Sequence, residues 1–266
     1  MRATRLADAA DPARFGGKAA GLSLALVAGL PVPDGAALEV ALVDALVVGE
    51  PAALAALREV RGALDGLLAA RSSAIGEDGG GASFAGQHLT VLGVDSPDEL
   101  AAAIRRIHAS ARAPAARAYR ARRGVAGEPA MAVLVQPLVA ARAAGVMFTC
   151  DPLTGDDVLV IEAALGLGEV VVSGEATPDR FRVDRRGRVV ERVQGEQDEA
   201  LLVVDGAVRR TALGPRAAPC LGEADLAALA ELADRVDRVF PPPHDIEFAF
   251  SPAGLVLLQR RPITAS

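Results

Sequence analysis

Large aromatic side chains are nearly absent from this sequence. Its 266 residues include no Trp and one Tyr, and aromatic residues make up only 3% of the chain. Because 51% of the residues are hydrophobic, the core must be built mainly from Leu, Val and Ala. That fraction, with 23% charged residues, is ordinary for a globular protein. The length suits one large domain or two modest domains.

Cysteines, long apolar runs and excess positive charge are also missing. The two cysteines, Cys150 and Cys220, lack a metal-ligand spacing, which favours a reducing compartment and two small buried side chains. The first residues do not resemble a signal peptide, and no stretch reaches the roughly 18 apolar residues of a membrane helix. A net charge of -6 argues against a nucleic-acid partner. We therefore expect a cytoplasmic protein without a membrane or nucleic-acid partner.

Lysine occurs only once. Of the 28 basic residues 27 are Arg, and the exception, Lys18, follows Gly16 and Gly17 directly. A lysine ammonium is a compact charge suited to phosphate, so a single retained lysine indicates chemistry that Arg does not replace. The two glycines precede a predicted helix over 18–30, whose N-terminus would favour an anion. Chance and an ordinary loop-to-helix turn remain the alternatives.

The hydrophobic pattern is mostly helical in the first half and typical of antiparallel strands in the second. This predicts an α+β protein of two subdomains, residues 1–137 and 138–266, with a hinge around Gln136 and Pro137. The glycine-rich segment 76–87 is either a loop that closes over phosphates or a disordered surface loop. We predict helices over 36–70 with a break at 49–51, over 98–123 as one helix or a pair interrupted at Pro114, and over 223–240. We predict strands over 89–94, 132–139, 145–149, 158–163, 181–184, 189–193, 201–204, 246–250 and 255–260.

The last two strands predict a hairpin that carries two carboxylates. Asp245 and Glu247 are two residues apart on a strand and therefore share a face, either as ligands or as a solvated edge. A three-residue loop over 252–254, with Pro first and Gly last, pairs Glu247 with Gln259 and Asp245 with Arg261. A two-residue loop would shift the register by one and send Gln259 to the opposite face.

Four segments, in this order, resemble the N-terminal ATP-binding domain shared by phosphoenolpyruvate synthase, pyruvate phosphate dikinase and rifampin phosphotransferase. They are FGGKAAGLSLALVAGLPVP (15–33), RSSAIGEDGGGASFAGQ (71–87), VMFTCDPLTGDDVLVIEAALGLGEVVVSGEATPDRF (146–181) and HDIEFAFSPAGLVLLQRRPIT (244–264). Together they span nearly the whole chain. The resemblance implies an ATP-grasp fold, in which two subdomains clamp a Mg²⁺–ATP complex.

The resemblance also implies roles for individual residues. The residue types suit these roles, because phosphoryl transfer needs cations near the phosphates and hard oxygen ligands for Mg²⁺. The implied set is Lys18, Arg71 and Arg261 as catalytic phosphate contacts, Gly86 and Gln87 in the covering loop, Gln136 on the adenine side, Glu162 as a nucleotide contact, Asp245 as a supporting acid, and Glu247 and Gln259 as metal ligands.

In this family a histidine on a swivelling domain takes the phosphoryl group from ATP, and no short Thr-His motif of that kind occurs here. We interpret His88, His108 and His244 as surface or loop residues, and the TPDRF segment (177–181) as the brace of a turn. We therefore expect a phosphotransferase that works with a phosphohistidine domain on a separate domain or protein. The alternatives are a non-enzymatic nucleotide-binding regulatory module and a stand-alone small-molecule kinase.

Overall fold

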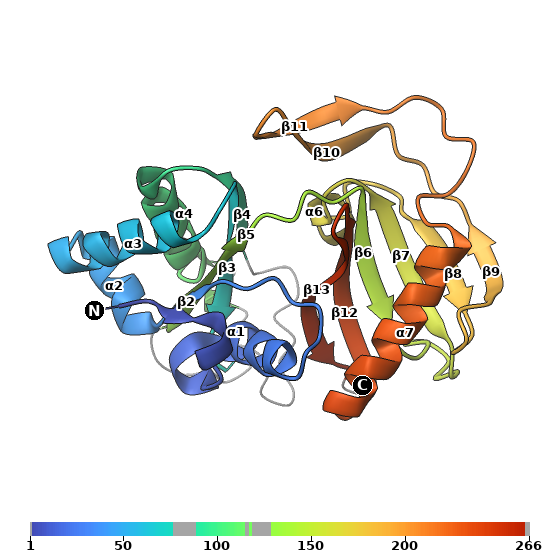
Figure 1. The fold of residues 1–266 in the computed structure, drawn as a ribbon, viewed down its shortest axis with the longest axis horizontal. Coiled ribbons are helices and arrows are strands. Elements are labelled where there is room, and N and C mark those ends of the chain that lie inside the picture. Colours follow the sequence, from blue (N-terminus) through green and yellow to red (C-terminus); the bar gives the residue numbers. More distant parts are fainter. Residues whose placement is uncertain (1, 77–88, 115–116, 119–128, 264–266) are drawn as a thin grey trace. The chain divides into compact units, whose positions relative to one another are not determined.

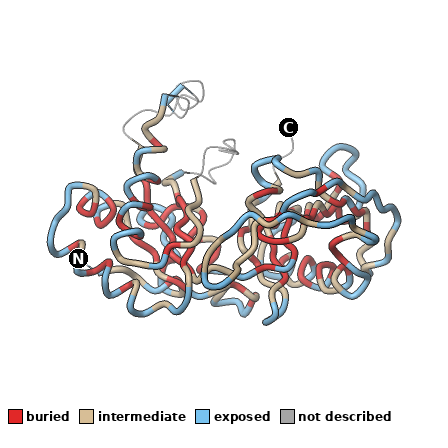
Figure 2. The backbone as a smooth tube through the Cα atoms, turned by 90° about the horizontal axis from the view of Figure 1, so that it is seen from above, coloured by how far each residue is buried: buried red, intermediate tan, exposed pale blue. Residues whose placement is uncertain are grey.

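The computed structural model describes residues 2–76, 89–114, 117–118 and 129–263. The chain divides into two compact units. The first unit comprises Met1–Val27 and Pro33–Leu138, and the second comprises Ala28–Val32 and Val139–Ser266. Buried residues gather in the interior of each unit (Figure 2). The units are described separately below.

The first unit is built on a five-stranded sheet in which every pairing is antiparallel. Strand β2 (Ala36–Leu38) and the start of β3 (Leu68–Ala74) lie in the segment 36–70, which was predicted to be helical on both sides of a break at 49–51. That prediction was wrong at both ends, because Ala- and Leu-rich runs carry little strand signal and tertiary pairing decides their structure. The strand order is β1 (Thr4–Arg5), β2 (Ala36–Leu38), β5 (Met131–Pro137), β3 (Leu68–Ala74) and β4 (Thr90–Val94).

Helices lie against this sheet (Figure 1). The break predicted at 49–51 is confirmed, since Gly49 ends one helix in a left-handed conformation and Pro51 begins the next. The predicted interruption of the segment 98–123 is confirmed, since the first helix ends at Ser110 and helical structure begins again at Pro114, which suits the first turn of a helix. The elements are η1 (Leu6–Asp8), α1 (Pro12–Val27), α2 (Val40–Val48), α3 (Pro51–Ala63) and α4 (Pro97–Ser110).

The two faces of the first sheet have different cover. Buried side chains of α2, α3 and α4 form one core with Ala70 of β3 and Val133 of β5. Residues of the opposite parity on β3, such as Ser73, instead contact α1. Among the described residues no single helix has the length and apolar character of a membrane span, and the pair α2 and α3 passes that test only jointly, across a bend of 113°.

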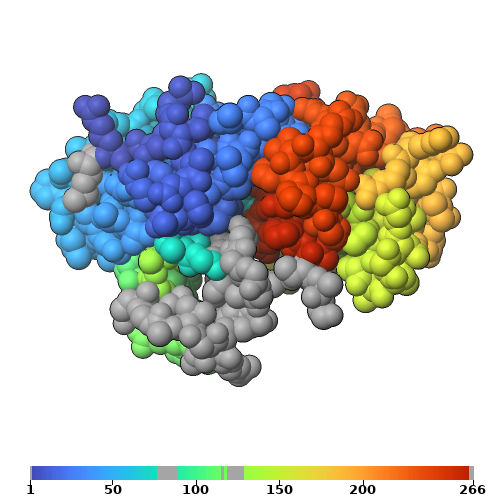
Figure 3. Space-filling view, turned by 90° about the horizontal axis from the view of Figure 1, so that it is seen from below, coloured from blue at the N-terminus to red at the C-terminus, as the bar shows by residue number. Residues whose placement is uncertain are grey.

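The second unit contains a six-stranded antiparallel sheet with α7 (Glu223–Val239) across one face (Figure 1). Ile246 and Phe248 of this sheet are fully buried, as are Leu229 and Val236 of the helix. The surface formed by α7 lies beside the terminal strands, coloured red in Figure 3. The strand order is β13 (Gly254–Pro262), β12 (His244–Ser251), β6 (Ala143–Phe148), β7 (Leu159–Leu165), β8 (Asp179–Val183) and β9 (Val189–Val193).

A separate two-stranded ribbon, β10 (Glu199–Val204) and β11 (Ala207–Ala212), and the short helix α6 (Glu169–Val172) complete the second unit. Strand β11 was not predicted. Its signal was nevertheless present, because Asp205 and Gly206 both have positive φ and an Asp-Gly pair is a strong hairpin turn.

Candidate functional site

The glycines before Lys18 form a turn that only glycine can make. Gly16 interrupts α1 with φ 76° and ψ 164°, a conformation that side-chain-bearing residues rarely adopt. A Cβ added at Gly16 would also overlap the carbonyl of Ser73 on β3. The turn and the strand therefore approach each other backbone to backbone.

Ser73 fastens this turn to the sheet. Its fully buried hydroxyl donates a hydrogen bond to the carbonyl of Phe15 at 2.6 Å and accepts one from the N–H of Ala19 at 3.0 Å. Lys18 lies within the fastened segment and Arg71 two residues before Ser73, and both are buried, with exposed fractions of 6% and 8%. Each has polar or electrostatic interactions within the chain, as buried cations require.

Gln136 lies on the same face of the first sheet as Arg71. The register pairs Ala69 with Gln136 and Arg71 with Leu134, and directly opposite residues share a face. The buried Gln136 amide donates to the carbonyl of Pro33 at 2.6 Å. The structure thus gives Gln136 a bond inside the first unit, and its role beside adenine stays a prediction. Gly86 and Gln87 lie outside the described residues.

The terminal hairpin has the predicted pairing at the site but not the predicted loop. Glu247 lies opposite Gln259 and Asp245 opposite Arg261, as expected. The turn, however, has two central residues, since Ser251 already pairs with Gly254. The Ser251 hydroxyl accepts from the N–H of Ala253 at 3.2 Å and helps to close this shorter turn.

A β-bulge reconciles the short turn with the predicted pairing. Phe248 pairs with Leu257 and Glu247 with Gln259, so Leu258 is an extra residue on β13. Without this extra residue, the two-residue turn would have placed Leu258 opposite Glu247 and turned Gln259 away. The predicted three-residue loop was therefore wrong, but the prediction that Glu247 and Gln259 lie on one face is confirmed.

Five of the predicted nucleotide residues lie on one face of the second sheet, opposite the face covered by α7. Across the strands, Glu247 is opposite Val146, Val146 is opposite Glu162, and Asp245 is opposite Phe148. The register therefore brings residues from β7, β12 and β13 onto a common surface. These residues are Glu162, Asp245, Glu247, Gln259 and Arg261.

Asp245 is the electrostatically strained member of this surface. Burial raises its pKa to about 6, the negative charge of Glu247 adds to the rise, and Arg261 opposes it. Its Oδ1 is buried and has no hydrogen-bond partner among the described residues. A buried carboxylate oxygen in that state is costly, and a bound cation would remove the cost.

The donor set fits a magnesium–nucleotide complex better than a closed metal cage. Among the described residues no three or more His, Cys, Asp or Glu side chains come together as a metal site. The hairpin offers the Glu247 carboxylate, the buried Gln259 amide and the buried Asp245 oxygen. Mg²⁺ usually takes one or two protein carboxylates and fills its remaining positions with water and substrate phosphates.

Behind the hairpin lies a polar cluster that the sequence did not reveal. We predicted His244 to be a loop residue, but it is the first residue of β12 and is fully buried. Its Nδ1 accepts a hydrogen bond from Arg260 Nε at 3.2 Å, and its Nε2 lies 3.3 Å from Asp237 Oδ1. Burial lowers the pKa of His244 to about 4, with Arg260 acting in the same direction. The available signal was strand alternation, which continues upstream from Phe248 through Ile246 to His244.

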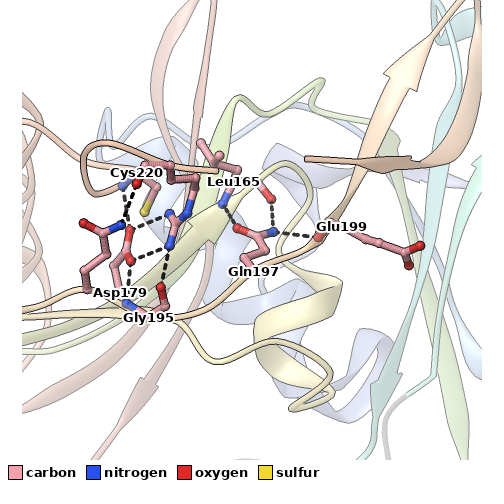
Figure 4. Close-up of polar contacts among 8 residues, drawn as sticks. Leu165, Asp179, Gly195, Gln197, Glu199 and Cys220 are labelled. Carbon is pink, nitrogen blue, oxygen red and sulfur yellow. Dashed lines mark hydrogen bonds and ion pairs between the residues drawn. The ribbon is translucent and has the colours of Figure 1, made fainter. Parts of the chain in front are cut away.

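Asp179 shows that the TPDRF segment is a brace, as interpreted (Figure 4). This buried carboxylate accepts two hydrogen bonds from Arg216, at 2.8 and 2.9 Å, and one each from the N–H groups of Gly195 and Cys220. Burial acts to raise the pKa of Asp179, but the guanidinium and the N–H groups outweigh it, so the pKa lies below its usual value. Burial also raises the pKa of Cys220, which agrees with a structural thiol.

Gln197 is a second structural anchor in the same region (Figure 4). Its side chain accepts from the N–H of Leu165 and donates to the carbonyl of Leu165, both at 2.9 Å, and it also donates to the carbonyl of Glu199. These bonds tie the β10–β11 ribbon to the end of β7. Neither Asp179 nor Gln197 is left available for a ligand.

Comparison of the sequence with known proteins shows the family to which it belongs. Residues 50–266 match the family described as pyruvate phosphate dikinase, AMP/ATP-binding domain. The chain belongs to this family. Similar proteins include a probable phosphoenolpyruvate synthase of Archaeoglobus fulgidus, 37% identical over 74% of this chain and 27% of that protein. A rifampicin phosphotransferase of a Streptomyces species is 40% identical over 74% of this chain and 23% of that protein.

Family membership confirms the resemblance and establishes an ATP-binding domain with the α+β, ATP-grasp fold class. The chain spans only about a quarter of the length of these two relatives. A solved D-alanyl-alanine synthetase A from Vibrio cholerae covers 97% of this chain and 58% of its own, at 14% identity and a TM-score of 0.40. At that level of similarity the fold class rests on the family match.

Proposed function

We propose that this chain is a Mg²⁺–ATP-binding phosphotransferase domain that passes a phosphoryl group from ATP to a histidine on a separate domain or protein. The observation that carries the proposal is the buried oxygen of Asp245, which has no hydrogen-bond partner in the part of the chain that the structure describes and lies on the same face as Glu247 and Gln259. Such an arrangement is unfavourable without a cation and is relieved by one.

The roles follow from the chemistry of phosphoryl transfer. Negative charge spreads over the phosphate oxygens during the transfer, and catalysis consists mainly of holding the phosphates and neutralising that charge. Lys18, Arg71 and Arg261 would supply fixed positive charge. Glu247 and Gln259 would hold Mg²⁺, which when bound neutralises phosphate charge, and Asp245 would complete their negative surroundings.

The described histidines make poor phosphate carriers. His244 is fully buried and neutral, on the face of its strand that points away from Glu247. His108 lies on α4, with its Nε2 3.2 Å from Asp44 Oδ1. This supports an acceptor histidine on another domain or protein.

The test is transfer of label from ATP. The pure chain is incubated with Mg²⁺ and with β- or γ-labelled ATP, alone and with a candidate histidine domain, and acid-labile label on the added domain is measured. We expect label from the β-position on that domain, with AMP and the γ-phosphate, released by water, as by-products, only when both proteins are present. A Lys18→Ala chain is the negative control.

The other outcomes identify the alternatives. ATP binding without transfer to any histidine domain would indicate a regulatory module. AMP or ADP formation by the chain alone, with a small acceptor, would indicate a self-sufficient kinase. A chain that binds no nucleotide would contradict all three functions.

A further inference from the structure

Ser73 holds the backbone on both sides of Lys18. Its hydroxyl donates to the carbonyl of Phe15 at 2.6 Å and accepts from the N–H of Ala19 at 3.0 Å. These two backbone groups stand just before and just after the turn formed by residues 16–18. The serine is fully buried, so water does not compete for either bond. One side chain thus restrains both ends of the turn that carries the lysine.

The bond to Ala19 also caps a helix from a distant part of the chain. Gly16 is not helical, so the regular part of α1 begins after it, and Ala19 lies in the first turn, where N–H groups lack partners inside the helix. A serine oxygen is a typical cap for such an N–H, but it normally comes from the residue just before the helix. Here it comes from β3, 54 residues further along the chain. The start of the helix, which includes Lys18, is therefore fastened to the sheet.

The strand that provides this cap also carries the second predicted phosphate contact. Arg71 and Ser73 are two residues apart on β3 and therefore share a face. The strand is paired with β5 along its whole length, which makes it a firm support. It provides Arg71 directly and holds the turn of Lys18 through Ser73.

We propose that Ser73 is a positioning residue that sets Lys18 relative to Arg71, so that both cations address the phosphates of ATP. Its hydroxyl is engaged within the fold, and it acts through Lys18 rather than on the nucleotide. Lys18 has further interactions within the chain, to which Ser73 adds a restraint on the backbone. This role deepens the proposed function and rests on it for the nucleotide.

Ser72 provides a matched control on the same strand. It is also fully buried, but it lies on the opposite face of β3, the face that packs against α2, α3 and α4. Its hydroxyl has no hydrogen-bond partner among the described residues. Ser72→Ala and Ser73→Ala therefore remove the same oxygen from adjacent buried positions, and only Ser73→Ala releases the turn of Lys18.

Hydrogen exchange of the Ala19 amide, measured without ligand, tests whether the restraint exists. This amide donates to the Ser73 hydroxyl, so we expect faster exchange in Ser73→Ala and native exchange in Ser72→Ala. Amides in the ladder between β3 and β5 should keep native protection in both variants, which would show that the sheet is intact.

Nucleotide affinity tests whether the restraint serves Lys18. Calorimetry gives the affinity for Mg²⁺–ATP of the wild type, Ser73→Ala, Lys18→Ala and the double variant. We expect Ser73→Ala to lower the affinity by about tenfold, the lower end of the loss for a charge-assisted contact, and Ser72→Ala to leave it unchanged. In the Lys18→Ala background, Ser73→Ala should have no further effect, because a residue that acts through Lys18 has no influence without it.

A merely structural role would lower the affinity by the same factor in both backgrounds. That result, native affinity in Ser73→Ala, or native exchange of its Ala19 amide would each overturn the positioning role and leave the proposed function standing. If Ser73→Ala does not fold, Ser73→Cys, whose thiol forms weaker hydrogen bonds, is judged by the same cycle. A wild-type chain that binds no Mg²⁺–ATP would overturn the proposed function, and this role of Ser73 with it.

Discussion

Acid should destabilise the second unit through His244. The imidazole is fully buried and neutral, with a pKa lowered to about 4. Arg260 and Arg185 oppose its protonation, whereas the carbonyl of Phe240 favours it, and Asp237 Oδ1 lies 3.3 Å from Nε2. In the unfolded chain a histidine titrates near pH 6.5, so between these values the unfolded state binds the proton first. Stability is therefore complete above about pH 6.5 and falls as the pH drops towards 4.

The size of the effect follows from the difference between the two pKa values. A difference of about 2.5 units corresponds to about 3 kcal/mol of unfolding free energy, lost almost completely by pH 4. About 1.4 kcal/mol should already be lost at pH 5.5. Asp245 acts in the opposite direction, because its folded pKa is raised to about 6 and its protonation relieves a cost. The wild-type curve alone therefore does not isolate His244.

The measurement compares the wild type with His244→Asn, which cannot titrate. Unfolding free energies of the second unit come from hydrogen exchange of the Ile246 and Phe248 amides between pH 7 and pH 4.5. An NMR titration of the three histidines gives the imidazole pKa directly. His108→Asn, on a helix of the first unit, is the matched control and should leave these amides unchanged.

We expect the difference in unfolding free energy between the wild type and His244→Asn to change by about 2 kcal/mol or more between pH 7 and pH 4.5. A difference that stays constant to about 0.5 kcal/mol over that range would contradict a role for His244. A measured imidazole pKa near 6.5 would refute it as well. Either result would mean that the ring is solvated or that Asp237 holds it charged.

Three further predictions address the site and the turn before Lys18. Lys18→Ala should weaken Mg²⁺–ATP binding by about 1.5–3 kcal/mol in calorimetry, with Lys18→Arg failing to restore it, because a charge-assisted phosphate contact is lost; native affinity in both would contradict this role. Gly16→Ala should destabilise the first unit by more than Gly66→Ala in urea unfolding, since both have positive φ but only the Gly16 Cβ meets a backbone carbonyl; equal costs would show that close approach is unimportant. Asp245→Asn should raise the stability of the metal-free chain at pH 8, where the carboxylate is charged, and lower Mn²⁺ affinity; lower stability would show that Asp245 has a structural partner.

The sequence predicted those elements that carry explicit signals. Gly49 and Pro51 mark the end of one helix and the start of the next, and the apolar stripe of α7 has a clear helical period. Strand β9 has the predicted bounds. The short strand β2 was missed because its Ala- and Leu-rich sequence favours a helix until the sheet pairs with it.

The hairpin shows a different limit of prediction. Its facing residues were predicted correctly from a loop that the structure does not contain, because a bulge at Leu258 compensates for the shorter turn. A single extra residue leaves the alternating pattern of β13 looking regular in the sequence. The cluster around His244 was invisible for a related reason, since it joins residues brought together only by the packing of α7 on the sheet.

Asp179 and Asp245 show what the structure adds to the question of function. Both are aspartates on strands of the same sheet, and in the sequence both look like ordinary strand-edge acids. Asp179 receives four hydrogen bonds and its pKa is lowered, so its charge is fully used inside the fold. Asp245 has a buried oxygen with no hydrogen-bond partner among the residues that the structure describes, a carboxylate neighbour and a raised pKa, so its charge is a cost to the ligand-free chain. A fold tolerates such a cost where binding will relieve it, and this difference favours Asp245 over Asp179 as a residue of the proposed ligand site.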